Sequence, residues 1–289
     1  MKLATFKRDG SSAEEVGIFL EGKIFALPEF KDMLSLIEAS TPETLRGLER
    51  RAKSAKPSDL LENFTLLAPI PRPRADIICL GLNYRDHIEE AARFNSKKFG
   101  IDMPKTVYFS KRAGEALPPF GKIPPHEDMC DSLDYEAELA VIISKNCRGV
   151  KAENAAECVF GYTIINDVSA RNVQTSRKQW FFGKSLDGFC PMGPVIAAAG
   201  DFPFPPSLSV RSSVNKEPRQ NSNTKFMIRQ IGEIIEELSS GFELRAGDII
   251  ATGTPSGVGL GFSPPKFLRR GDEIACEIEG IGSLVNFVG

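Results

Sequence analysis

Three carboxylates stand at spacings that could hold a divalent cation. Glu136 and Glu138 lie two residues apart in the run DYEAELAVII, and Asp167 ends the apolar run GYTIIND. Side chains of a strand alternate between its two faces, so Glu136 and Glu138 point the same way. Asp167 stands where a predicted strand gives way to a loop, a position that suits ligand-binding groups. Together the three residues would form an all-oxygen, trianionic site.

Such a site needs a compensating partner, because two buried glutamates side by side repel each other and lose hydration. A bound cation, a basic side chain or protonation of one carboxyl would each compensate, and the glutamate face of an edge strand could instead face water. For a cation, hard oxygen ligands favour Mg²⁺ or Mn²⁺, with Ca²⁺ as a further option, over zinc and copper. Three protein ligands leave coordination positions for water or substrate, as a catalytic metal requires.

A histidine and a glutamate three residues apart could act on a proton. His87 and Glu90 lie in the helix-like run NYRDHIEE, where positions i and i+3 share a face. A carboxylate beside an imidazole raises the basicity of the ring and fixes its tautomer, so the pair could activate water as a general base. A casual contact on a surface helix is the alternative interpretation.

Two further segments could bind an anion. Lys184 lies between the aromatic run WFF and a stretch rich in glycine and proline. A lysine there could stabilise an enolate or a carboxylate, or be an ordinary solvated side chain. The turn TGTPSGVG, residues 252–259, has glycines that allow backbone N–H groups to approach an anion closely. A bare hairpin turn is the alternative, and without a GxxxxGK[ST] pattern nucleotide binding is unsupported.

The composition argues against several classes of partner. The 289 residues are 42% hydrophobic and 26% charged, with a formal net charge of -2, an ordinary balance for a globular protein. With no excess of basic residues, nucleic acid and anionic membrane are poor candidates. No apolar run reaches the roughly 20 residues of a membrane helix, and the first residues lack a signal-peptide pattern. Six cysteines without a CxxC pair predict reduced thiols in a cytoplasmic protein.

The elements that must position these residues are mainly strands. We expect a small α+β N-terminal domain over residues 1–70, ended by the proline-rich run PIPRPR, and a larger domain over residues 71–289. The larger domain is predicted to be mainly β with some α. In the first domain the expected strands are 3–6, 16–20 and 24–27, and the helices are 32–38 and 42–55. In the second, the expected strands are 77–80, 106–109, 135–144, 161–165, 248–251, 273–278 and 284–288, and the helices are 86–94 and 228–238.

Six motifs, in this order, resemble those of the fumarylacetoacetate hydrolase family. They are GLNYRDHIEE, DYEAELAVII, GYTIINDVSARNVQ, QWFFGKSLDGFCPMGP, GDIIATGTPSGVG and the terminal GDEIACEIEGIGSLVNFVG. The resemblance runs from about residue 77 to the end of the chain. It implies the mixed β-roll catalytic domain of that family, in a homodimer, behind a short N-terminal domain of the kind found in many bacterial members.

The resemblance also implies roles for individual residues. Lys111 fits a family position beside the substrate pocket, although Arg112 follows it where many members have proline. The metal ligands fall on Glu136, Glu138 and Asp167, the water-activating dyad on His87 and Glu90, and the other substrate contacts on Gln174, Lys184 and Thr254.

The implied activity is metal-dependent cleavage of a C–C bond in an acylpyruvate-like 2,4-dioxo acid. The metal would chelate the carboxylate and 2-oxo oxygens while the dyad directs water to the distal carbonyl. A pyruvate enolate would leave, stabilised by the metal and Lys184. The same site could instead decarboxylate oxaloacetate-like acids, or isomerise or hydrate dienoates. A metal-binding relative without activity is the remaining alternative, although no ligand or dyad residue is missing. Each active reading implies a small 2-oxo or dioxo acid as partner.

Overall fold

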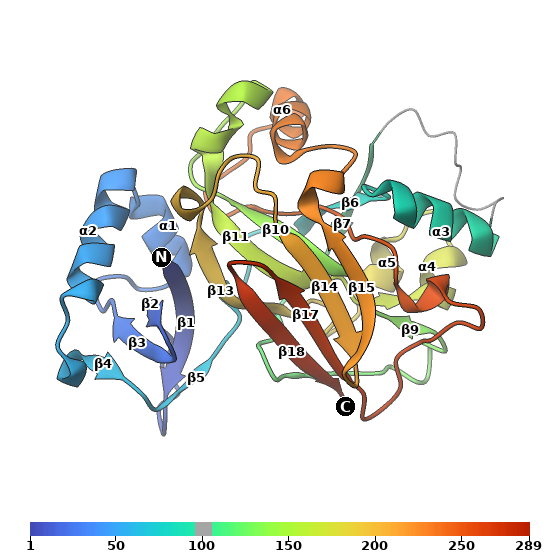
Figure 1. Ribbon diagram of the computed structural model, residues 1–289, viewed down its shortest axis with the longest axis horizontal. Helices are drawn as coiled ribbons and strands as arrows, with labels where there is room; N and C mark the ends of the chain where they lie inside the picture. Colours follow the sequence, from blue (N-terminus) through green and yellow to red (C-terminus); the bar gives the residue numbers. More distant parts are fainter. Residues whose placement is uncertain (96–105) are drawn as a thin grey trace.

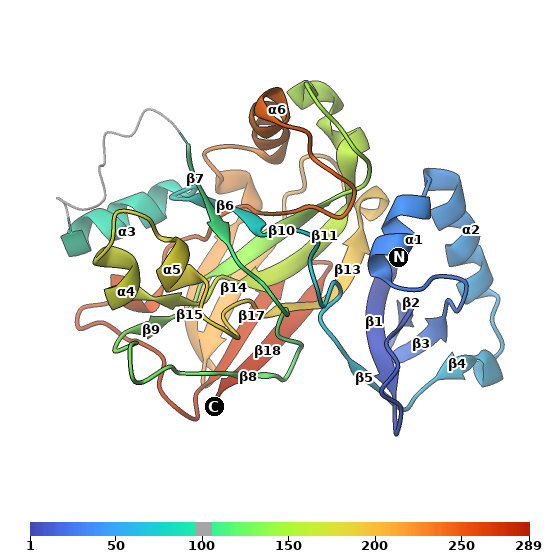
Figure 2. The same ribbon diagram turned by 180° about the vertical axis from the view of Figure 1, so that it is seen from behind.

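Two β-sheets packed face to face dominate the computed structural model, which describes residues 1–95 and 106–289. Helices lie at the ends and edges of the sheets rather than between them (Figures 1 and 2). The architecture is therefore mainly β with some α, as the sequence predicted. No helix in these two ranges is long and apolar enough to cross a membrane.

The larger sheet has eleven strands and continues from the N-terminal region into the rest of the chain. Its order is β4-β3-β2-β1-β13-β11-β10-β16-β6-β7, and β5 pairs with β1. The strands are β1 (Lys2–Arg8), β2 (Glu15–Leu20), β3 (Lys23–Ala26), β4 (Leu60–Leu61), β5 (Phe64–Leu66), β6 (Ile77–Gly81), β7 (Val107–Lys111), β10 (Ala137–Ile143), β11 (Val159–Asn166), β13 (Met192–Ala198) and β16 (Ile249–Ala251).

The smaller sheet has five strands in the order β15-β14-β17-β18-β8. Strands β14 and β15 form a hairpin whose turn residues, Asn215 and Lys216, both have positive φ. The sequence prediction did not include this hairpin, nor strands β8 and β13. The strands are β8 (Lys122–Ile123), β14 (Ser209–Val214), β15 (Glu217–Asn223), β17 (Glu273–Ile278) and β18 (Gly282–Val288).

Strand β10 lies between two apolar clusters, and all seven of its residues are buried. Leu139 packs in one cluster with Val210 and Leu284 of the smaller sheet. Ala140 points the other way and belongs to the second cluster. Because side chains alternate along a strand, Glu138 shares the direction of Ala140. The near-continuous apolar sequence of β10 follows from this burial on both faces.

The N-terminal region adds two helices to its strands. Helix α1 (Met33–Ala39) begins at Asp32, whose side chain accepts a hydrogen bond from the backbone N–H of Ser35. Helix α2 (Pro42–Lys53) is capped in the same way by Thr41. Strand β1 pairs with β13, so strands on both sides of the boundary expected at residue 70 share one sheet. The division into domains at that residue stays a prediction.

Four helices lie near the ends of β6, β10 and β11. They are α3 (Arg85–Asn95), α4 (Arg171–Thr175), α5 (Phe181–Lys184) and α6 (Ile231–Gly241). The strand expected over residues 135–144 is shorter in the structure, because β10 begins only at Ala137, and Tyr135 and Glu136 separate it from β9 (Leu133–Asp134). At the break the Asp134 side chain accepts from the Tyr135 N–H, and the Asn166 side chain accepts from the Glu136 N–H. Strand β12 (Ser169–Ala170) pairs with β9.

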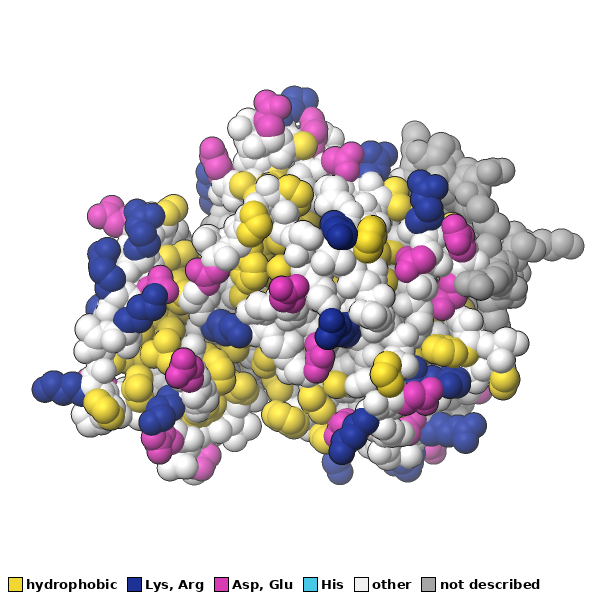
Figure 3. All heavy atoms as spheres, viewed as in Figure 1, with side chains coloured by type: hydrophobic (Ala, Val, Ile, Leu, Met, Phe, Trp, Pro, Cys, Tyr) yellow, Lys and Arg dark blue, Asp and Glu magenta, His cyan; other side chains and the backbone are white. Residues whose placement is uncertain are grey.

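On the face shown in Figure 3, acidic and basic side chains are interspersed. No extended area of that face carries one sign of charge alone. Such a surface gives no indication of a polyanionic partner such as nucleic acid.

Candidate metal centre and active site

Three buried carboxylates meet where β10 begins and β11 ends. Glu136 directly precedes β10, Glu138 is its second residue, and Asp167 directly follows β11. The antiparallel pairing of Glu138 with Ile165 brings these strand ends together. One oxygen atom from each carboxylate lies within 4.8 Å of those of the other two. The three acids therefore converge as the sequence predicted.

Three cationic side chains surround this triad, Glu136, Glu138 and Asp167. The Nζ atom of Lys184 lies 2.8 Å from Oε2 of Glu136 and 2.7 Å from Oδ2 of Asp167. Nη1 of Arg171 lies 2.7 Å from Oε1 of Glu136, and Nζ of Lys111 lies 2.7 Å from Oδ1 of Asp167. Basic partners, one of the compensations considered from the sequence, are thus present for two of the three acids.

Glu138 has no ion pair with any described residue. Its Oε2 accepts a hydrogen bond of 2.9 Å from the backbone N–H of Gly253. Burial, together with the charges of Asp167 and Glu136, raises the pKa of Glu138 well above its ordinary value. Burial alone would also raise the pKa of Glu136, but the charges of Lys184 and other cations outweigh it and lower that pKa to about 2. Without a cation the protonated form of Glu138 is therefore favoured, and a bound divalent metal would favour the ionised form.

Buried polar atoms without hydrogen-bond partners gather around the triad. Among the residues that the structure describes, these atoms include Nδ2 of Asn166, Nη2 of Arg171 and Oη of Tyr84, whose pKa is raised by burial and by Glu138. Each buried polar atom left unpaired costs about 1–3 kcal/mol, so a missing ligand or water is the expected explanation. The all-oxygen donor set fits Mg²⁺ or Mn²⁺.

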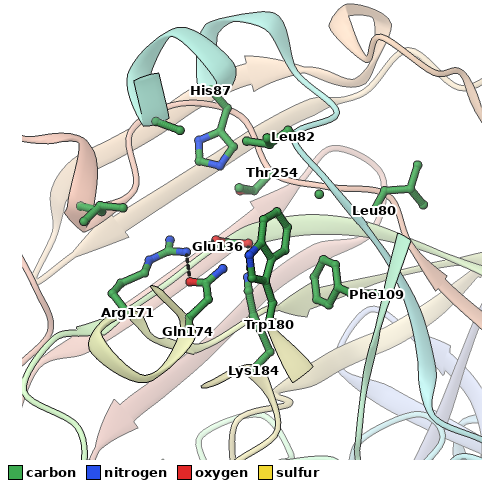
Figure 4. Close-up of a pocket in the computed structure, with 13 residues that line it drawn as sticks. Leu80, Leu82, His87, Phe109, Glu136, Arg171, Gln174, Trp180, Lys184 and Thr254 are labelled. Carbon is green, nitrogen blue, oxygen red and sulfur yellow. Dashed lines mark hydrogen bonds and ion pairs between the residues drawn. The ribbon is translucent and has the colours of Figure 1, made fainter. Parts of the chain in front are cut away.

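A histidine–glutamate pair on α3 faces the triad. Nδ1 of His87 lies 3.0 Å from Oε2 of Glu90, and Oε1 of Glu90 accepts a 2.9 Å hydrogen bond from the backbone N–H of Gly257. Gly261 lies so close that a Cβ there would overlap the Glu90 carboxylate. The imidazole points into the space between α3 and the sheet (Figure 4). The pair expected from its helical spacing is therefore present, and one of its two residues, His87, lines the site.

A cavity of about 30 Å³ connects the pair with the triad. Its polar side chains come from α3, the start of β10, α4, α5 and the turn after β16 (Figure 4). They are His87, Glu136, Arg171, Gln174, Lys184 and Thr254. Predicted substrate contacts Gln174, Lys184 and Thr254 are therefore gathered in one place.

Lys111 is placed differently from the other predicted substrate contacts. Its side chain is fully buried and does not line the cavity. In addition to Asp167, Nζ of Lys111 contacts the backbone oxygen atoms of Val168, at 3.1 Å, and Lys184. Through these contacts Lys111 stabilises the positions of the triad and of α5. A direct contact between Lys111 and substrate stays a prediction.

Arg171 was not singled out from the sequence, yet it links several parts of the site. Besides Glu136, it binds Asp134 through Nε at 2.8 Å and Gln174 through Nη1 at 3.0 Å. Asp134 in turn accepts hydrogen bonds from the backbone N–H groups of Gly259 and Leu260. The only local signal was that Arg171 precedes Gln174 by three residues, which places both on one face of a helix.

Comparisons with known proteins agree with the family resemblance of the sequence motifs. A family model described as fumarylacetoacetate (FAA) hydrolase C-terminal matches residues 76–289. Oxaloacetate tautomerase YisK of Bacillus subtilis is 47% identical over 278 residues, which cover 93% of this chain and 90% of that protein. A fumarylacetoacetate hydrolase structure from Exiguobacterium antarcticum is 41% identical, with a TM-score of 0.84 over 100% of this chain and 99% of that chain.

A further solved structure carries a metal. Maleylpyruvate hydrolase from Sphingobium sp. SYK-6, in complex with manganese(II) and pyruvate, is 28% identical to this chain. The TM-score is 0.78, and the match covers 100% of this chain and 98% of that one. The folds of the two proteins are therefore alike over their whole length.

Proposed function

The chain belongs to the fumarylacetoacetate hydrolase family, and from that premise we propose that it is a divalent-metal-dependent tautomerase of oxaloacetate or a similar small 2-oxo acid. One observation carries the proposal: three buried carboxylates converge, and Glu136 of this triad and His87 of the His–Glu pair line one small cavity. The substrate and the reaction are supported by the 47% identity to a protein named an oxaloacetate tautomerase. This reading takes the place of C–C bond hydrolysis, the first expectation from the sequence.

The triad would hold Mg²⁺ or Mn²⁺. When bound, the cation supplies positive charge that stabilises an enolate and the substrate carboxylate. Support comes from the oxygen-only donor set, from the unpaired polar atoms around it, and from the manganese ion and pyruvate in the maleylpyruvate hydrolase structure.

Lys184 would assist as a cationic hydrogen-bond donor rather than as a base. Burial alone lowers the pKa of Lys184, but the charges of Asp167 and Glu136 outweigh it and raise that pKa above its ordinary value. The ammonium group therefore keeps its proton at neutral pH. Since Lys184 lines the cavity, it can donate to the 2-oxo oxygen of the substrate as negative charge develops there.

His87 would move the proton. Because a carboxylate only accepts hydrogen bonds, Nδ1 of His87 donates to Glu90 and leaves Nε2 with a free electron pair. Nε2 takes a proton from C3 of the keto acid, and the electrons of that C–H bond form the C2–C3 double bond. The π electrons of the C2=O bond move to the 2-oxo oxygen, which then takes the proton back from Nε2 of His87, so that the enol and the neutral imidazole result. The reverse sequence restores the keto form, and no water is consumed.

Hydrolysis of a C–C bond in an acylpyruvate is the second candidate. The His87–Glu90 pair could equally orient and deprotonate a water, and one structural relative is a maleylpyruvate hydrolase. Hydrolysis, like decarboxylation of oxaloacetate, would release pyruvate, whereas tautomerisation would not.

Freshly dissolved oxaloacetate provides the test. The ultraviolet absorbance of its enol is followed with Mg²⁺ or Mn²⁺ and with excess EDTA, while a lactate dehydrogenase assay measures pyruvate in the same sample. We expect metal-dependent acceleration of enol–keto exchange without matching pyruvate release. If acetylpyruvate is cleaved with a higher kcat/KM than oxaloacetate is tautomerised, hydrolysis replaces the proposal. Absence of both reactions with either metal would refute it.

A further inference from the structure

We propose that Trp180 sets the length of the 2-oxo acid that the cavity accepts and restricts it to short chains of about four carbons. The inference deepens the proposed function and rests on it for the position of the carboxylate and 2-oxo group at the triad. It concerns the opposite, apolar wall of the cavity, which is made by Leu80, Leu82, Phe109, Trp180 and Leu260.

The indole of Trp180 is seated on bare backbone at the end of β6. A Cβ on Gly81 would overlap the ring at Cζ3 and would lie 2.9 Å from Cη2. Only a residue without a side chain lets the ring approach that closely. Gly81 therefore forms a notch that holds the indole across the cavity.

A second aromatic ring supports the indole from β7. The ring of Phe109 meets that of Trp180 edge to face, with centroids 5.4 Å apart and an interplanar angle of 68°. Edge-to-face pairs of this kind are favourable beyond the area they bury. Figure 4 shows the indole between Gln174 on one side and Phe109 on the other. Turning the ring aside to admit a longer ligand would lose the Phe109 contact and the Gly81 notch together.

The same short segment places both ends of the cavity. Trp180 directly precedes α5, and its backbone oxygen accepts a 3.2 Å hydrogen bond from the N–H of Lys184. The Lys184 ammonium reaches the triad, while the indole forms the apolar wall. The ammonium group that reaches the triad and the indole that lines the cavity are therefore positioned relative to each other within one turn of helix.

The polar side chains of the cavity fit a short anionic ligand. The polar residues Arg171 and Gln174 can face a carboxylate at the fourth carbon, whereas a longer chain has to cross the indole. One methylene more or less in such a pocket changes affinity by about 10–200-fold.

The test measures binding of unbranched 2-oxo acids to the Mn²⁺-loaded protein. Trp180 is the single tryptophan of the chain, so fluorescence of the unmodified protein reports directly on this wall. Calorimetry gives dissociation constants for the variants. In the unmodified protein we expect affinity to fall by at least about tenfold from the four-carbon to the six-carbon acid. Trp180→Ala should remove most of that decrease.

Phe182→Ala is the matched control. Phe182 lies within α5, two residues after Trp180, is 43% exposed and does not line the cavity, so its loss should leave the length dependence unchanged. Trp180→Phe should give a dependence of affinity on chain length between those of the unmodified protein and Trp180→Ala. It replaces the alanine variant if that variant does not fold.

Equal affinity of the unmodified protein for four- and six-carbon acids would overturn the assignment of Trp180 but not the proposed function. The same dependence of affinity on chain length in Trp180→Ala and in Phe182→Ala would have the same meaning. Failure of the metal-loaded protein to bind pyruvate or any longer 2-oxo acid would overturn the proposed function as well.

Discussion

At the scale of single residues, charge explains how one buried site can bind both a metal and an anion. The triad carries three negative charges when fully ionised, and Asp134, which pairs with Arg171, adds a fourth. Lys111, Arg171 and Lys184 supply three positive charges. A divalent cation would then give the cluster a net charge of about +1, from these formal charges. A positive cluster attracts the carboxylate of a small 2-oxo acid, and this favours an anionic ligand over an uncharged acyl chain.

Glu138→Gln should increase the thermal stability of the metal-free protein. The raised pKa of Glu138 means that the folded protein keeps a proton that the unfolded chain releases at lower pH. Stability of the metal-free protein therefore falls as pH rises from the ordinary glutamate range through the raised pKa. Glutamine has no such proton to lose. At pH 8 we expect a gain of about 1 kcal/mol, or about 2 °C in Tm, which shrinks towards pH 5.

The same variant should lose the response to metal. Mn²⁺ should raise the Tm of the unmodified protein by mass action and leave that of Glu138→Gln unchanged. The exposed Glu153→Gln variant, as control, should behave like the unmodified protein. An equal Tm increase in Glu138→Gln would show that Glu138 is not a ligand.

His87→Ala should slow turnover without weakening metal binding. Loss of a general base costs about 10²–10⁴ in rate, and the imidazole is not part of the carboxylate triad. Steady-state kinetics and Mn²⁺ titration of the same preparation separate the two effects. Glu89→Gln is the control, since Glu89 is the exposed neighbour of Glu90. Unchanged kcat in His87→Ala would remove His87 from the mechanism.

At the scale of elements, contacts from the turn after β16 fix the position of α3. Ser256 donates a 2.7 Å hydrogen bond to Asp86 at the start of α3, and the Gly257 N–H donates to Glu90 further along the helix. Gly261 completes the contact by leaving room for the Glu90 carboxylate. The sequence suggested that glycines of this turn bind an anion. In the structure the anionic group that they contact is a side-chain carboxylate of the protein itself.

Gly261→Ala should therefore damage catalysis through Glu90. The new Cβ would occupy the position of the Glu90 carboxylate, so Glu90 must leave His87. We expect kcat to fall by about 10²-fold or more, with Mn²⁺ affinity unchanged, because the triad is untouched. Gly47→Ala, where a Cβ meets no atom within 4 Å, is the control. Full activity of Gly261→Ala, measured beside that control, would contradict the role of this turn.

The sequence predicted those elements and residues whose signal is local. Helix spacing alone places His87 beside Glu90, and the expected strand put Glu136 and Glu138 on one side, although Glu136 directly precedes β10 in the structure. Asp167 was predicted from its position at the end of an expected strand and from the family resemblance. The contact between Lys111 and Asp167 could not be predicted, since it depends on how β7 and β11 pack. These two strands are far apart in the chain. Arg171 escaped notice for the same reason, because its partners Asp134 and Glu136 lie on a different element.

The hairpin of β14 and β15 shows the corresponding limit for elements. Its strands contain many polar residues and Pro218, and its turn has Asn215 and Lys216 without the glycine that marks most tight hairpins. Val210 and Val214 of β14 are apolar, four residues apart, and they pack in the apolar cluster shared with the larger sheet. The strand propensity is weak, so tertiary packing rather than local preference determines the hairpin.

At the scale of the whole molecule, the N-terminal region is built into the catalytic sheet. Leu3 of β1 pairs with Ile196 of β13, so strands from residues 1–70 extend the sheet that carries the triad. Phe6 belongs to the same apolar cluster as Tyr135 and Leu139 beside the site. Removing the first region would expose both the edge of β13 and part of this cluster.

One cooperative unfolding transition is therefore expected for the full chain. Calorimetric and van't Hoff enthalpies should agree, and amide hydrogens of β1 and β13 should exchange with similar protection. Added Mn²⁺ at about 100 times its Kd should stabilise both regions together by about 2.7 kcal/mol, because the metal binds only the folded sheet. Two transitions, with the earlier one confined to residues 1–70 and insensitive to Mn²⁺, would contradict this coupling. In that case β1 would be an attached strand rather than a structural part of the metal centre.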